Sequence, residues 1–133
     1  MPACVIDTSA VLAVLLGERE RDALIHVTEG VELIAPASVH WEIGNALSAG
    51  LKRRRFGPDD AQRALQSYDL IPIRFVEVEL AESLVLAATH GVYAYDAYLL
   101  VCARQQRVPL LTLDASLARV ARSLDLPLLG LES

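Results

Sequence analysis

Cysteine is scarce in this sequence, and its placement argues against two kinds of protein. The only two cysteines, Cys4 and Cys102, lie far apart in apolar runs. A small secreted domain held together by disulfides would contain more of them. No CxxC or His–Cys spacing indicates a zinc site. We therefore expect two reduced core cysteines in a cytoplasmic protein.

Long hydrophobic runs and an N-terminal basic region are also missing. The longest apolar stretch, Ala10 to Leu16, is too short to span a membrane. No basic residue precedes Asp7, which argues against a secretory signal. We therefore expect no association with a membrane.

The sequence contains few basic and few aromatic residues. The 12 Lys and Arg residues are outnumbered by 17 Asp and Glu residues, giving a formal net charge of -5. That balance argues against a generic cationic nucleic-acid binder, although it allows a local basic surface. Aromatic residues make up 5% and hydrophobic residues 53%, so a core of Leu, Val and Ala is expected. At 133 residues the chain fits one domain, residues 1–133, and is too short for two ordinary ones.

Short continuous apolar runs alternate with helical patterns along the chain. The runs at 3–6, 32–35, 70–76 and 108–113 read as buried strands, and 126–129 as a short fifth one. The pattern predicts a three-layer α/β/α sandwich with a central parallel sheet of four to five strands. Ser38 is the expected N-cap of the third helix. The helices are expected at 10–16, 18–29, 38–55, 61–68, 77–90, 95–107 and 114–124.

Four acids stand where packing alone does not explain them. Asp7 and Asp114 directly follow predicted strands, and the carboxyl ends of parallel strands meet at one edge of a sheet. Glu42 lies beside the apolar stripe of its helix, with Asn45 on the same side, and Asp96 opens a later helix. Each aspartate alone could instead cap a helix, and Glu42 could be a partly exposed acid at the edge of its helix.

If these acids lie close together, their carboxylates favour one kind of site. Clustered carboxylates repel one another, which raises their pKa values unless a cation neutralises them. Oxygen-only ligation suits Mg²⁺ or Mn²⁺ better than zinc. A site of this kind activates water and stabilises charge on a phosphate, so the expected reaction is phosphodiester hydrolysis.

The segments that carry these acids resemble a known family. Asp7 in VIDTSAVLAVL, Glu42 in WEIGNAL, Asp96 in YDAYLL and Asp114 in LTLDASLARVA are similar to the acidic signature of PIN-domain ribonucleases. The size and element order resemble VapC-type toxins of toxin–antitoxin operons, from Val5 to about Leu129. The resemblance implies a PIN-like fold and a metal-dependent endoribonuclease that cleaves RNA. It also implies a homodimer, and a heterotetramer or larger assembly with a VapB-like antitoxin whose tail covers the acidic site.

The resemblance also implies roles for individual residues. Asp7, Asp96 and Asp114 would be the main ligands of Mg²⁺ (or Mn²⁺), while Glu42 would bind a second metal or orient the attacking water. The residues suited to support these ligands from behind are Thr8, Ser9, Asn45 and Thr112.

The sequence departs from some relatives one turn into the last helix. Leu117 and Ala118 stand where those relatives carry a further acid, which weakens the case for a second metal. Three tyrosines, Tyr93, Tyr95 and Tyr98, flank Asp96. Core or dimer packing and the stacking of RNA bases are both open roles for them.

The only cationic run lies at the end of the helix that carries Glu42. Cations stabilise the C-terminus of a helix through its dipole, and they also bind RNA phosphates, so both roles are open. The run consists of Lys52, Arg53, Arg54 and Arg55.

Three other classes of protein were weighed against a nuclease. A receiver-like phosphoacceptor domain resembles this chain in gathering acids at a sheet edge, but it pairs two acids after the first strand and a lysine near a late strand. Here Ile6 precedes Asp7, and Lys52 lies in a mid-chain helix. A haloacid-dehalogenase-like phosphatase would need an aspartate where Ser9 stands. A non-catalytic interaction module would not need four acids.

Overall fold

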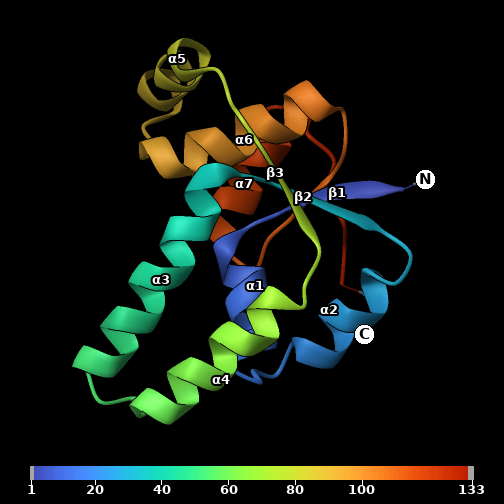
Figure 1. Ribbon diagram of the computed structural model, residues 1–133. Helices are drawn as coiled ribbons and strands as arrows, with labels where there is room; N and C mark the ends of the chain where they lie inside the picture. The colour runs from blue at the N-terminus through green and yellow to red at the C-terminus, as the bar shows by residue number, and fades with distance from the viewer. Residues whose placement is uncertain (1, 132–133) are drawn as a thin grey trace.

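A parallel sheet of four strands forms the centre of the molecule. The computed structural model describes residues 2–131 (Figure 1). The strands lie side by side in the order β3-β2-β1-β4. Their bounds are β1 (Ala3–Ile6), β2 (Glu32–Pro36), β3 (Ile73–Val76) and β4 (Leu110–Leu111).

The two middle strands have continuous apolar sequences because both faces of the sheet are covered. Val5 of β1 is fully buried and pairs with Ile34 of β2 on one side and Leu110 of β4 on the other. The expected core cysteines, Cys4 and Cys102, are free thiols and fully buried. Burial raises the pKa of each thiol to about 11, which keeps them protonated and unreactive at neutral pH.

The helices form a layer on each side of the sheet, as Figure 1 shows. The chain passes from β1 to β2 to β3 in one direction and then returns past β1 to β4. Right-handed crossovers therefore place the first four helices on one face and the last three on the other. The predicted three-layer sandwich is confirmed. The first group is α1 (Thr8–Leu15), α2 (Arg21–Val27), α3 (Ala37–Lys52) and α4 (Pro58–Asp69), and the second is α5 (Leu80–His90), α6 (Ala94–Gln106) and α7 (Ala115–Ser123).

Some predicted boundaries are wrong for identifiable reasons. Ser38 is not the cap of α3, because the chain leaves β2 directly at Pro36, which is the N-cap residue. The same helix ends at Lys52 rather than Arg55. The fifth strand is reduced to one isolated bridge between Leu110 and Leu128.

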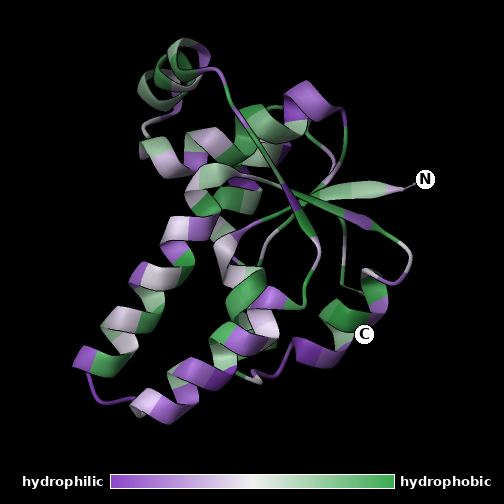
Figure 2. Cartoon of the chain, in the orientation of Figure 1, coloured by the Kyte–Doolittle hydropathy of each residue, from purple (hydrophilic) through white to green (hydrophobic). Residues whose placement is uncertain are grey.

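Hydrophobic residues follow the strands and the helix faces that cover them, and Figure 2 shows hydrophilic residues at the connection between α3 and α4. Within residues 2–131, no single helix is long and apolar enough to cross a membrane. Only α5 and α6 taken together reach that length and hydropathy, and the chain bends by 115° between them.

Candidate active site at the carboxyl edge of the sheet

The candidate site lies where β1 and β4 end side by side. From β1 the chain moves away toward β2, whereas β4 pairs with the other side of β1. Connections that leave neighbouring strands in opposite directions open a crevice at their carboxyl ends, where α/β proteins bind ligands. The Asp7 N–H donates to the Leu111 carbonyl at 3.1 Å, which fixes the ends of the two strands against each other.

Asp7 occupies the centre of this edge and is only 4% exposed. It is the N-cap of α1, and its Oδ1 accepts from the Ala10 N–H at 3.0 Å and from the Ser9 hydroxyl at 2.7 Å. Its Oδ2 accepts from the Thr112 hydroxyl after β4. Ser9 Oγ also accepts from the Leu113 N–H at 3.0 Å. Asp7 is thus a capping residue, as its position allowed, and it is held from both strands.

Asp114 is connected to Asp7 through Thr112. The Asp114 N–H donates to Thr112 Oγ1 at 3.0 Å, and the same hydroxyl donates to Asp7. Asp114 is the N-cap of α7, with its Oδ1 accepting from the backbone of Ser116 at 2.9 Å and Leu117 at 3.2 Å. Its side chain is exposed, so the carboxylate caps the helix and still faces solvent.

Asp96 and Glu42 come to the site from helices on opposite faces of the sheet. Asp96 does not cap α6, because Tyr93 holds that position, and it lies half-buried in the first turn. Glu42 lies half-buried in the second turn of α3. Glu42 Oε1 and Thr8 Oγ1 are both buried, and neither makes a hydrogen bond of ordinary geometry with the described residues. A buried carboxylate oxygen without a donor is costly and needs a partner.

The pKa values of three of the acids are raised in part by repulsion from the others. Burial raises the pKa of Asp7, and repulsion from Asp114 adds to the rise, although hydrogen bonds from Thr112, Ala10 and Ser9 oppose it. Burial also raises the pKa of Glu42; the nearby Thr8 hydroxyl partly offsets this, and repulsion from Asp96 and Asp7 adds to it. The pKa of Asp96 is raised by burial and by Asp114. The ion pairs of residues 2–131 include none of these acids, so their charge has no internal compensation.

The side chains do not by themselves form a finished metal centre. Within the described part of the chain, no three Asp, Glu, His or Cys side chains stand close enough together to hold a metal ion as they lie. The donor set nevertheless fits a hard divalent cation, since it offers carboxylate oxygens, uncompensated negative charge and the partnerless Oε1 of Glu42.

A groove opens beside Glu42 along α3. It has a volume of about 520 Å³. Trp41, at 74% exposure, forms part of its wall, and it was not among the residues predicted from the sequence to belong to the site. The signal for it was available, since Trp41 lies outside the apolar stripe formed by Val39, Ile43 and Leu47. The groove is lined by Thr8, Trp41, Glu42, Asn45, Ala46, Ala49 and Tyr95.

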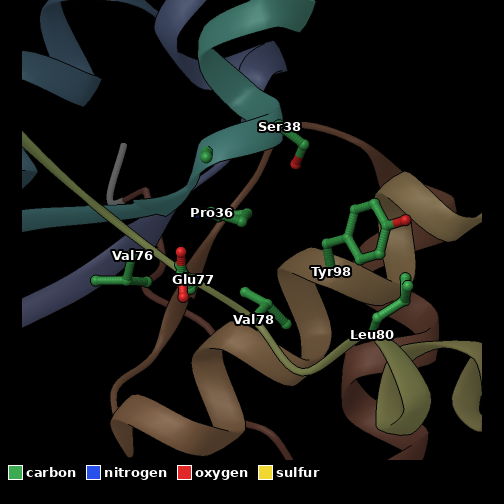
Figure 3. Close-up of a pocket in the computed structure, with 8 residues that line it drawn as sticks. Pro36, Ser38, Val76, Glu77, Val78, Leu80 and Tyr98 are labelled. Atoms are coloured by element: carbon green, nitrogen blue, oxygen red, sulfur yellow. The ribbon is translucent and has the colours of Figure 1, made fainter.

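A second hollow, of about 300 Å³, lies at the carboxyl ends of β2 and β3. Ser38 is one helical turn before Glu42, so the two hollows follow the same face of α3. The Ser38 hydroxyl has no hydrogen-bond partner among residues 2–131 and points toward the hollow (Figure 3). This hollow is lined by Pro36, Ala37, Ser38, Val76, Glu77, Val78, Leu80 and Tyr98.

The basic run lies away from the acids. Its four residues, Lys52 to Arg55, are exposed at the far end of α3, which points away from α6 and α7 in Figure 1. Ten residues of helix separate Lys52 from Glu42, a distance of about 15 Å. The structure therefore does not bring the run into the acidic cluster.

Comparisons with known proteins agree with this architecture. The model of the family described as PIN domain matches residues 4–123. No curated protein matches the chain.

Several solved structures share the fold. The structure of PAE2754 from Pyrobaculum aerophilum is 26% identical, covers 88% of this chain and 77% of that one, and has a TM-score of 0.68. VapC20 from Mycobacterium tuberculosis, described as a toxin that cleaves the sarcin–ricin loop, is 14% identical, with coverages of 88% and 94% and a TM-score of 0.63. VapBC2 from Rickettsia felis, bound to a DNA fragment from its promoter, is also 14% identical, with coverages of 95% and 96% and a TM-score of 0.65.

Proposed function

The chain belongs to the PIN domain family, and on that premise we propose that it is a metal-dependent endoribonuclease that hydrolyses RNA phosphodiester bonds. One observation carries the proposal. Carboxylates from four separate segments lie around the switch point of the sheet, burial and repulsion raise the pKa of three of them, and none pairs with a cation among residues 2–131. A folded protein keeps such an arrangement at a cost to its stability, which an external divalent cation removes.

The proposed metal is Mg²⁺ or Mn²⁺, and its ligands are Asp7, Asp96 and Asp114, with Glu42 beside them. When bound, such a cation lowers the pKa of water and neutralises charge on the phosphate. The unpartnered Oε1 of Glu42 is suited to accept a hydrogen bond from the attacking water and so to orient it.

Residues that hydrogen-bond to the acids would hold their side chains in position. Thr112 bonds to both Asp7 and Asp114, and Ser9 bonds to Asp7 while it receives the Leu113 N–H. These contacts fix the rotamers of the ligands, as supporting residues do around metal sites. Thr8 and Asn45 line the groove beside Glu42, where they would contact the water or the substrate.

The proposed biological role is that of the toxin in a toxin–antitoxin pair acting in the cytoplasm. It rests on the VapC and VapBC descriptions of two structures that share the fold. A VapB-like antitoxin would place a basic side chain among the unpaired acids, and the toxin would form a homodimer that joins it in a heterotetramer or larger assembly. The exposed run from Lys52 to Arg55 would contact RNA phosphates outside the acidic site.

A receiver-like phosphoacceptor role has less support. That chemistry needs a lysine near the acids, and the only lysine of the sequence, Lys52, lies at the far end of α3. An interaction module without catalysis does not account for the unpaired Glu42 oxygen.

The direct test is cleavage of a single-stranded RNA by the purified protein. Cleavage should require Mg²⁺ or Mn²⁺, stop in EDTA and return when Mn²⁺ is added in excess. Cleavage that continues in EDTA would contradict the proposal. Co-expression with a small reading frame upstream tests the partner separately, because a stable complex that keeps full nuclease activity would refute inhibition and leave the enzyme assignment intact.

A further inference from the structure

We propose that the groove beside Glu42 holds one unpaired RNA base, stacked against Trp41 and Tyr95. This inference rests on the proposed function and specifies how its substrate is bound. It assigns to this site a single-stranded nucleotide next to the scissile phosphate. The observations that carry it are the two aromatic walls, the uncharged character of most of the lining, and the position of Glu42 within it.

The two walls of the groove are aromatic and exposed. Trp41 comes from α3 and Tyr95 from α6, and their exposures are 74% and 56%. Each ring packs against a second ring. His40 contacts Trp41 edge-on at a centroid distance of 4.8 Å, and Tyr98 contacts Tyr95 edge-on at 6.0 Å. Packed rings present their faces at low entropic cost, and base stacking on such rings does not depend on sequence.

The charge of the groove selects a base over a phosphate. Glu42 is the only charged residue in the lining, and no lysine or arginine contributes to it. A phosphate would find no basic side chain in this lining, whereas the face of a base is neutral and needs none. Asn45 adds an exposed amide that can both donate to and accept from the edge of a base. The lining therefore suits a base and disfavours the backbone.

The location of the groove places this base next to the reaction. Glu42 belongs both to the groove and to the acidic cluster. A base held there directs its own phosphate toward Asp7 and Asp96. A base in a duplex cannot enter between two rings, because it is stacked and paired already. The groove would therefore make the enzyme select unpaired nucleotides in loops or single strands.

Trp41 is the only tryptophan of the sequence, so its fluorescence reports on the groove alone. The experiment titrates a single-stranded RNA hexamer into the Asp96→Asn variant, which the proposed function expects to bind RNA without cleaving it. We expect saturable quenching of Trp41. An abasic hexamer with the same backbone and a duplex of the same sequence should not quench it.

Matched tyrosine variants separate stacking from general aromatic effects. Tyr95→Ala should weaken hexamer binding about ten-fold, the size expected for the loss of one stacked base. Tyr95→Phe should retain the affinity. Tyr93→Ala should bind as the parent does, because Tyr93 is 85% exposed but does not line the groove.

The inference would be overturned by the absence of quenching, by equal quenching by the abasic hexamer, or by equal losses of affinity in Tyr95→Ala and Tyr93→Ala. If Trp41→Ala instead converts a dimer to a monomer in light scattering and leaves RNA affinity unchanged, a second copy of the chain covers this groove and the inference is wrong. Failure of the proposed function gives a different pattern. The wild-type protein would then not cleave RNA, while quenching and the Tyr95→Ala effect could still be observed.

Discussion

Five carboxylates elsewhere in residues 2–131 are paired with arginines, whereas those at the carboxyl edge of the sheet are not. Glu32 pairs with Arg74 and Glu82 with Arg104, each at 2.7 Å. Asp60 receives the Gly57 N–H at 3.1 Å and pairs with Arg63, and these contacts hold its pKa below the ordinary value.

The pKa values of Asp7, Glu42 and Asp96 move the other way. Burial and mutual repulsion raise them. The chain has eleven arginines, so cations are available, yet the described residues place none beside these acids. This difference supports the proposal that the acidic cluster binds a cation from outside.

The largest expected effect is on RNA cleavage, when the loss of an unpaired acid at the sheet edge is compared with the loss of an acid paired with arginine. Asp7→Asn or Asp96→Asn should lower RNA cleavage by about 100-fold or more, because each removes a ligand of a metal worth several kcal/mol in the transition state. Asp60→Asn should retain wild-type cleavage. Initial rates on a single-stranded RNA at saturating Mn²⁺ measure both. Equal rates for Asp96→Asn and Asp60→Asn would remove the distinction between the two kinds of acid.

A supporting hydroxyl should have the next largest effect. Thr112→Val removes the hydroxyl that donates to Asp7 and accepts from the Asp114 N–H, and it should weaken Mn²⁺ binding about 10- to 100-fold. Thr89→Val is the matched control, since the Thr89 hydroxyl bonds only to the Val85 carbonyl within α5. Calorimetry with both variants checks the prediction. Unchanged Mn²⁺ affinity in Thr112→Val would show that the hydroxyl serves folding alone.

The free energy of unfolding should rise in the variant that loses RNA cleavage and fall in the variant that keeps it. In the absence of metal, Asp96→Asn should raise the free energy of unfolding by about 0.5–2 kcal/mol, because it removes repulsion from a half-buried site. Asp60→Asn should lower it, since the charged form of Asp60 is favoured by its partners. Urea denaturation in EDTA measures the two changes. Destabilisation by Asp96→Asn would mean that the Asp96 charge has a favourable partner in the fold.

The smallest expected effect is a change of this stability difference with pH. A raised pKa in the folded state means that the folded protein binds more protons than the unfolded chain as the pH falls. Wild-type Asp96 therefore loses its destabilising charge when the pH falls from about 7 through its raised pKa toward the ordinary carboxyl range. The stability gain of Asp96→Asn over wild type should shrink accordingly. A gain that is constant from about pH 7 to about pH 4 would contradict the raised pKa.

The sequence was sufficient to predict the position of Asp7 and Asp114. Each follows a short apolar strand, and the parallel arrangement of such strands dictates that their carboxyl ends share an edge. The relative rotation of α3 and α6 was not predictable in the same way. It decides whether Glu42 and Asp96 approach each other and whether Trp41 and Tyr95 line the same groove, and it depends on side-chain packing across the sheet.

Local errors had local causes. Ser38 has the residue type of a helix cap, but Pro36 already supplies the extended backbone that begins α3. Ser38 is therefore left inside the first turn with a buried hydroxyl that has no partner among the described residues. Asp96 likewise has the type of a cap and lies within the first turn of α6. Residue type alone does not fix the position of a helix start to within one or two residues.

The most direct test of the account is a calorimetric titration of Mn²⁺ into the metal-free protein. The account predicts saturable binding to wild type, loss of that binding in the Asp7→Asn, Asp96→Asn double variant, and full binding to Asp60→Asn. Mn²⁺ binding that is absent in wild type, or equal in wild type and the double variant, would show that the unpaired acids at the edge of the sheet do not form a metal site.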